Sequence, residues 1–183
     1  MYGLVNKAVQ DLIVTKFGQE KWIEIKEEAA IDVETFVSMD SYPDEVTYKL
    51  VGAASVVLGI PAETILETFG EYWTEFTAKE GYGEVFSLAG NTFLEFIQNL
   101  DNLHSRVGLS FPKLEPPRFH CSDITEDSLR LHYYSDRDGL APMVSGLIRG
   151  LAKHFETEVH ASLDKSRANG DDHDEFLIRF GAP

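Results

Sequence analysis

The apolar residues of this 183-residue chain change their spacing partway along the sequence, and this change limits the folds available to it. Up to about residue 107 they recur every three to four positions, as on one face of a helix. Residues 129–134 instead alternate between apolar and polar, as in a half-buried strand, and similar runs occupy 159–163 and 176–180. A helical pattern over 140–155 separates the first run from the others. The sequence predicts an α+β fold, a helical first part followed by an antiparallel sheet with a helix.

Turn-forming residues divide the helical part into segments. Gly18 and Gly59 are typical helix stops, and Pro61 suits the start of the following helix. Asn91 is expected to cap a helix that continues to Val107. The expected helices cover residues 4–17, 22–29, 44–58, 61–76 and 91–107, with a break at Gly81-Tyr82-Gly83. Pro112, Pro116 and Pro117 disfavour helix and mark the change to the sheet-containing part.

Charge and cysteine content exclude several classes of function. The chain carries 31 acidic and 16 basic residues, and its net charge of -15 disfavours nucleic acid and anionic membranes as partners. Cys121 is the single cysteine, so an intramolecular disulfide and a multi-thiolate metal site are ruled out. The N-terminus shows no signal-peptide core, and no apolar stretch is long enough for a membrane span. We therefore expect a globular protein of the cytoplasm.

His104 lies on the apolar face of the last expected helix. It follows Ile97 by seven positions and Leu100 by four, which places its imidazole toward the core. A buried imidazole needs a partner, either a backbone carbonyl or a metal ion. A third possibility is an enzyme that uses His104 or His132 as a general base, although no nucleophilic residue lies at a sequence spacing typical of a nucleophile–base pair. The spacing alone does not decide between a hydrogen-bonded core histidine, a metal ligand and a general base.

A second group of polar residues ends the alternating run. The strand pattern predicts that Tyr133, Ser135 and Arg137 share one face. A phenol, a hydroxyl and a guanidinium at this spacing can bind carboxylates. Arg137 could instead pair at the surface with Asp136 or Asp138. A regulatory domain that anchors an apolar carboxylate ligand, such as a fatty acid, through Arg137 and Tyr133 is the main alternative function.

These motifs together resemble the H-NOX family, the haem nitric oxide/oxygen binding domains related to the haem domain of soluble guanylate cyclase. The family signature Y-x-S-x-R stands here as Tyr133, Ser135 and Arg137, preceded by the helical His104. Further matches are Met1-Tyr2-Gly3, Phe69-Gly70, Pro116-Pro117 and Gly170-Asp171-Asp172-His173. The resemblance covers essentially the whole chain. It implies one H-NOX domain over residues 1–183, with a distal helical subdomain at 1–65 and a proximal one at 66–183.

The resemblance also implies a cofactor and its contacts. His104 would be the proximal ligand of haem b (iron protoporphyrin IX), and Tyr133, Ser135 and Arg137 would bind its propionates. Pro117 matches the proline that presses on the macrocycle and keeps it non-planar. The residues expected to form the pocket walls are Val5, Phe69, Trp73, Pro117, Met143 and Leu147.

The expected function is a gas sensor without catalytic activity of its own. Oxygen-binding relatives carry a distal tyrosine five residues beyond the motif arginine, where this chain has Pro142. We therefore expect binding of nitric oxide and carbon monoxide but little oxygen, with Trp73 as the only wall residue that could donate a hydrogen bond. The implied signal is breakage of the iron–His104 bond, read by a histidine kinase or a cyclic-di-GMP enzyme. Some relatives bind zinc through cysteines, and with Cys121 alone we expect no zinc here.

Overall fold

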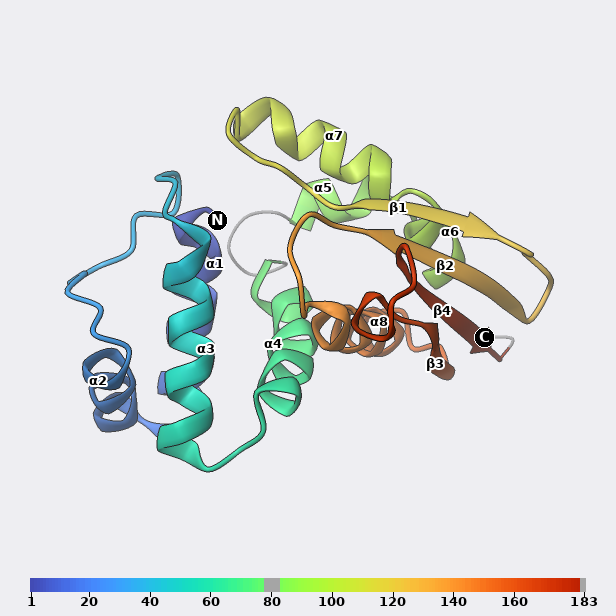
Figure 1. The fold of residues 1–183 in the computed structure, drawn as a ribbon. Helices are drawn as coiled ribbons and strands as arrows, with labels where there is room; N and C mark the ends of the chain where they lie inside the picture. Colours follow the sequence, from blue (N-terminus) through green and yellow to red (C-terminus); the bar gives the residue numbers. More distant parts are fainter. Residues whose placement is uncertain (78–82, 182–183) are drawn as a thin grey trace. The chain divides into compact units, whose positions relative to one another are not determined.

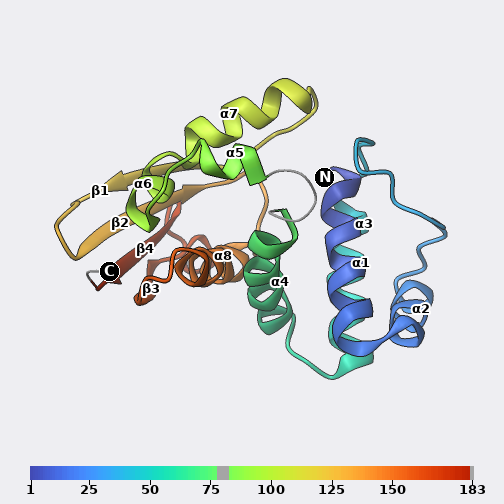
Figure 2. The same cartoon turned by 180° about the vertical axis from the view of Figure 1, so that it is seen from behind.

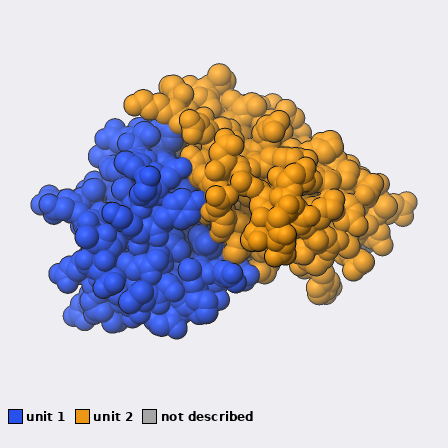
Figure 3. All heavy atoms as spheres, in the orientation of Figure 1, with its two compact units in different colours: residues 1–69 blue, residues 70–183 orange. Residues whose placement is uncertain are grey.

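The computed structural model describes residues 1–77 and 83–181, and the chain divides into two compact units, residues 1–69 and 70–183. Figure 1 shows the ribbon and Figure 3 shows the two units in separate colours. Both units contain helices, and the second contains an antiparallel sheet. This arrangement confirms the α+β class predicted from the sequence. The predicted break at Gly81 and Tyr82 lies outside the described residues.

The first unit is helical. It contains α1 (Gly3–Phe17), α2 (Gln19–Glu28), α3 (Asp44–Leu58) and the beginning of α4 (Ala62–Thr77). Gly18, with φ of 91°, and Gly59, with φ of 64°, end α1 and α3 in the backbone region that favours glycine. The Thr47 hydroxyl donates a buried hydrogen bond of 2.7 Å to the side-chain oxygen of Asn6. This bond joins α3 to α1, which are far apart in sequence.

Three short helices begin the described part of the second unit beyond α4. They are α5 (Gly83–Ser87), α6 (Phe93–Gln98) and α7 (Leu100–Ser110). The single helix predicted from Asn91 to Val107 is wrong, because the chain interrupts it at Asn99. The Asn99 side-chain amide donates to the carbonyl of Ala89 at 2.9 Å, a bond that competes with helix continuation.

The residue that caps α6 also differs from the prediction. Thr92, rather than Asn91, is the N-cap, and its hydroxyl accepts the Glu95 N–H at 3.2 Å. The Glu95 carboxylate in turn accepts the Asn91 N–H at 2.9 Å. This reciprocal pair resembles a capping box: it satisfies the Glu95 N–H, which the first helical turn leaves without a partner, and the Asn91 N–H just before the N-cap.

The sheet has four strands in the described chain. They are β1 (Arg118–Ser122), β2 (Ser128–Tyr134), β3 (Val159–Lys165) and β4 (Asp174–Phe180), in the order β1-β2-β4-β3 with every neighbouring pair antiparallel. The terminal hairpin predicted from the last two alternating runs is present as β3 and β4, joined through a 3-10 turn at Arg167–Asn169. Strand β1 was not predicted, because only Phe119 among its residues is both apolar and buried.

The core of the second unit lies between one face of the sheet and two helices. Leu129 and Leu131 of β2 and Phe176 of β4 are almost fully buried there, together with Ile148 of α8 (Ala141–His154). Phe93, Phe96 and Ile97 of α6 complete the same cluster. On β2 the intervening residues are only half-buried, which confirms the alternation predicted for this strand.

Two glycines allow α4 to approach α8 closely, as Figure 2 shows. A Cβ atom added to Gly70 would lie 2.1 Å from the carbonyl oxygen of Met143. A Cβ on Gly150 would lie 2.7 Å from the carbonyl oxygen of Glu71. Both distances are too short for a side chain, so the two helices pack backbone against backbone at these points.

No single helix in the described ranges is long and apolar enough to cross a membrane. Helices α3 and α4 taken together have the length and apolar composition of a membrane span, but the chain bends by 115° at the break between them.

Candidate functional site

The position of His104 is fixed by contacts between α7 and β1. Asp101, one helical turn earlier, accepts the backbone N–H of Phe119 at 2.6 Å. The imidazole of His104 stacks on the Phe119 ring, with centroids 5.7 Å apart and planes inclined by 16°. The residue as a whole is half-buried, so the predicted inward orientation places it at the edge of the core and not within it. The stacking on Phe119 holds the ring against the sheet.

One nitrogen of the His104 imidazole is buried without a partner. Within the described residues, Nδ1 makes no hydrogen bond. Burial lowers the pKa of His104 below its ordinary value, and the nearby carboxylate of Asp101 opposes that change. The ring is therefore neutral near pH 7, and a neutral imidazole has a lone pair available for a metal ion. One interpretation of the sequence was a core histidine bonded to a backbone carbonyl. Such a bond through Nδ1 is absent from the described part of the chain.

The Y-x-S-x-R residues lie where β2 ends. Tyr133 is buried in the strand, and the centroid of its ring lies 5.3 Å from that of Phe119, so Phe119 contacts both Tyr133 and His104. The prediction that all three motif residues share a strand face is wrong for Ser135 and Arg137, because β2 ends at Tyr134. Both belong to the following turn, in which the Ser135 hydroxyl accepts the Arg137 N–H at 3.1 Å.

Two arginines hold this turn in place. Arg137 donates to the backbone carbonyl of Glu115 at 2.7 Å and lies 3.9 Å from the Glu115 carboxylate. Arg167 donates to the Ser135 carbonyl and pairs with Asp138 at 2.9 Å. The turn that carries the two polar motif residues is thus preorganised by contacts from both sides.

The predicted wall residues are distributed over both units. Trp73 on α4, Pro117 just before β1, and Met143 and Leu147 on α8 belong to the second unit, and all four are half-buried. Trp73 stacks on Phe76, with centroids 6.1 Å apart. Val5 on α1 is half-buried and Phe69 on α4 is buried, and both belong to the first unit. Large apolar side chains that keep part of their surface open are suited to contact a flat apolar ligand.

Three residues of the site were not found from the sequence. Asp101 and Phe119 connect α7 to β1, and Glu115 receives Arg137. The sequence pattern could have predicted an inward position for Phe119. It lies two positions after Pro117 and two before Cys121, which places all three on one face of an extended segment. Asp101 and Glu115 carry no such signal, because each acts on a residue at least 18 positions away.

The chain matches the family model described as Haem-NO-binding over residues 2–163. A soluble guanylate cyclase of Caenorhabditis elegans, gcy-31, is 34% identical over 160 residues, which cover 87% of this chain and 23% of the relative. The soluble guanylate cyclase subunit beta-2 of Rattus norvegicus is 38% identical over 122 residues, or 63% of this chain and 18% of the relative. The chain thus spans about a quarter or less of the length of these relatives.

Solved structures agree on the fold. An H-NOX protein from S. oneidensis, crystallised in the Fe(II)NO ligation state, superposes with a TM-score of 0.91 at 22% identity and covers all of both chains. At this identity the likeness concerns the fold, whereas the family-model match covers most of the sequence. The chain belongs to the haem-NO-binding, or H-NOX, family of haem-binding gas-sensor domains.

Proposed function

We propose that this chain binds haem b with His104 as the protein ligand of the iron. The observation that carries the proposal is the buried Nδ1 of His104, which has no partner in the described chain although the ring is held by Phe119. An unpaired buried polar atom costs about 1–3 kcal/mol. Occupation of the site by a metal-bearing cofactor is a physical reason for tolerating that cost, and the neutral state of the ring suits ligation.

Other residues of the chain would supply the remaining contacts that a haem requires. Tyr133, Ser135 and Arg137 would hold the two propionates, since they combine a phenol, a hydroxyl and a guanidinium within five residues. Pro117 would press on the macrocycle. The apolar walls would come from Val5, Phe69, Trp73, Met143 and Leu147. The donor set therefore fits a group with one metal, two carboxylates and a flat apolar body.

The absorption spectrum and the haem content of the purified protein test this proposal directly. We expect a strong Soret band and about one haem per chain. A colourless protein that carries no haem even after reconstitution would contradict the proposal. The alternative function, binding of an apolar carboxylate such as a fatty acid through Arg137 and Tyr133, would then be favoured.

When bound, a ferrous haem supplies an open coordination position for nitric oxide or carbon monoxide. Oxygen binding is stabilised by a hydrogen-bond donor on the distal side, and Pro142 has neither a hydroxyl nor an N–H. Pro142 lies in the first turn of α8, where a missing N–H costs the helix nothing. We therefore propose selectivity for nitric oxide and carbon monoxide, with Trp73 acting as a wall residue.

Exposure of the ferrous protein to air checks the proposed selectivity. We expect slow oxidation without a stable oxygenated spectrum, whereas nitric oxide and carbon monoxide should each give a stable complex. As a gain-of-function comparison, Pro142→Tyr places a phenol at the position of the distal tyrosine and should increase oxygen binding. A wild-type protein that remains oxygenated for hours would contradict the proposal.

The proposed signal is the release of His104 from the iron when nitric oxide binds. His104 is connected to β1 through Asp101 and Phe119, so its release would alter how α7 packs on the sheet. A separate or fused effector that distinguishes the two states would complete the switch, because a ligand shifts an equilibrium only through differential binding. We propose a histidine kinase or a cyclic-di-GMP enzyme. An effector whose activity in complex with the chain is unchanged by nitric oxide would contradict that assignment.

A further inference from the structure

Ionisable side chains line the face of the sheet that is turned away from the core. His120, His132, Glu175 and Lys165 occupy register positions opposite one another across all four strands of the described sheet. His173, just before β4, extends over the same face, and its ring stacks on Tyr134 with centroids 4.4 Å apart. None of these side chains takes part in the proposed haem contacts, although Tyr133 lies on the opposite face of the same strand.

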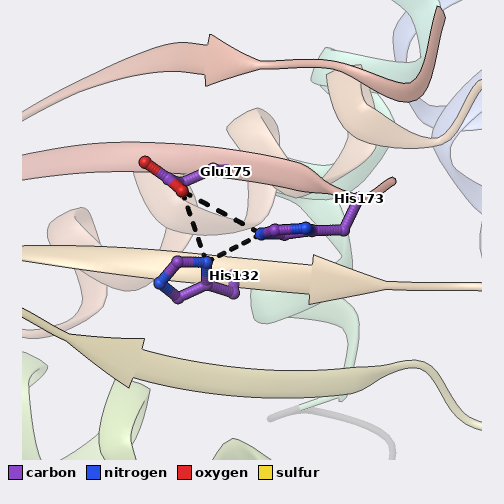
Figure 4. A group of neighbouring side chains, drawn as sticks. All are labelled: His132, His173 and Glu175. Atoms are coloured by element: carbon purple, nitrogen blue, oxygen red, sulfur yellow. Dashed lines mark hydrogen bonds and ion pairs between the residues drawn. The ribbon is translucent and has the colours of Figure 1, made fainter. Parts of the chain in front are cut away.

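Three of these side chains converge on one point, as Figure 4 shows. His132 Nδ1 lies 2.8 Å from His173 Nε2 and 3.5 Å from Glu175 Oε2. His173 Nε2 lies 3.9 Å from the same carboxylate oxygen. His173 and Glu175 are buried and His132 is half-buried, so the group is built into the sheet and is not a chance encounter of mobile surface residues.

We propose that His132, His173 and Glu175 form a binding site for a divalent transition-metal ion of the zinc type. Zinc binds histidine nitrogen and carboxylate oxygen at about 2.0–2.2 Å in a tetrahedral arrangement, which places neighbouring ligand atoms about 3.4 Å apart. The three observed separations are distributed around this value. Three protein ligands would leave the fourth position to water. This proposal does not depend on haem binding.

The second nitrogen of each imidazole is held by an oxygen. Asp172 Oδ1 lies 2.7 Å from His173 Nδ1, and Ser122 Oγ lies 2.8 Å from His132 Nε2. Metal-ligating histidines commonly donate their other N–H to a carboxylate or another oxygen, which fixes the tautomer and the ring orientation. If both rings donate outward in this way, both lone pairs point at the common centre and repel each other. A metal ion at the centre would bind both lone pairs and so remove the repulsion between them.

The charges around Glu175 are compatible with such an ion. Arg130 bonds to Oε1, whereas Lys165 Nζ donates to Oε2 at 2.8 Å, the oxygen that faces the histidines. The Lys165 side chain is 49% exposed, so it can move into solvent and leave Oε2 to the metal.

The proposal differs in its donors from the zinc site whose absence was expected from the sequence. That expectation rested on the presence of Cys121 alone, and cysteine plays no part in the present cluster. His132 and His173 are 41 positions apart, and only the pairing of β2 with β4 brings them together.

Calorimetric titration of zinc into the purified protein tests the site. We expect one tight zinc ion per chain, with His173→Asn and His132→Gln each weakening binding about 100-fold or more, because a ligand is lost. Asp172→Asn, a change at a side chain that is 83% exposed, should weaken binding about 10–100-fold without disturbing the fold. His160→Gln on β3 is the matched control, since this histidine is 82% exposed and outside the cluster.

X-ray absorption at the zinc edge provides a second measurement on the unaltered protein. The spectrum should show nitrogen and oxygen ligands, including two imidazoles, and no sulfur. Absence of a tight zinc ion in the wild-type protein, or tight binding that survives both histidine substitutions, would overturn the proposal. The Soret band, recorded on the same samples, separates this result from any failure of haem binding.

Discussion

Replacing His104 by glycine is expected to remove the proposed protein ligand of the haem iron. Changes to residues that only support a metal ligand reduce metal affinity about 10–100-fold, so loss of the ligand itself should reduce haem affinity at least as much. The Soret band should shift or disappear, and added imidazole, which fits the volume left by the side chain, should restore it. Absorption spectroscopy and the rate of haem transfer to an acceptor protein measure the effect.

The matched control for this substitution is Ser105→Gly. Ser105 is the next residue on α7 and is exposed, so its replacement loosens the helix backbone by a similar amount, about 0.5–1 kcal/mol, without touching the proposed ligand. We expect its spectrum to match that of the unaltered protein. Unchanged histidine ligation in His104→Gly would refute the role of His104, and His120 or His132 would then be tested in the same way.

Replacing Gly70 by alanine should destabilise the second unit strongly. The new Cβ would lie 2.1 Å from the Met143 carbonyl oxygen and 2.8 Å from the Leu147 backbone nitrogen. Neither backbone atom can rotate away as a side-chain tip could, so α4 and α8 must separate. Overpacking of this kind costs about 1–3 kcal/mol or more. For a chain of this size that cost lowers the melting temperature by about 2–4 °C per kcal/mol, which thermal unfolding can measure.

Gly52→Ala supplies the comparison for Gly70→Ala. Gly52 is an exposed residue of α3, and a Cβ added there meets nothing within 4 Å. Because alanine favours helix over glycine by about 1 kcal/mol, this variant should be as stable as the parent or slightly more so. Equal melting temperatures for Gly70→Ala and the parent would show that α4 and α8 do not pack closely. Trp73, Met143 and Leu147 would then lose their proposed common site.

The sequence predicted best those elements whose signal is local. Helix α1 and strand β2 follow directly from the spacing of apolar residues, and Gly18 and Gly59 stop their helices because of their own backbone freedom. Strand β1 was missed because it is short, with Phe119 as its only buried apolar residue. The interruption at Asn99 was missed because it depends on a bond to Ala89, ten positions away.

The candidate site shows the same division between local and distant signals. His104, the Y-x-S-x-R residues and the further short motifs, taken together in their order and spacing, assigned the chain to a family, and the family-model match confirms that assignment. The sequence did not reveal that Asp101 and Phe119 hold His104 in place. It also placed Ser135 and Arg137 in a strand, whereas they lie in the turn beyond it.

The sequence by itself determined the elements with a clear local period, such as α1 and β2, the inward side of β2, and the residue types available for a haem. These properties depend on neighbours within a few positions. Only the tertiary structure decided which distant residues meet: Phe119 under His104, Glu115 at Arg137, and His132 with His173 and Glu175. Strand register and helix packing create these contacts, and both depend on the cooperative burial of the whole core, which no local pattern specifies.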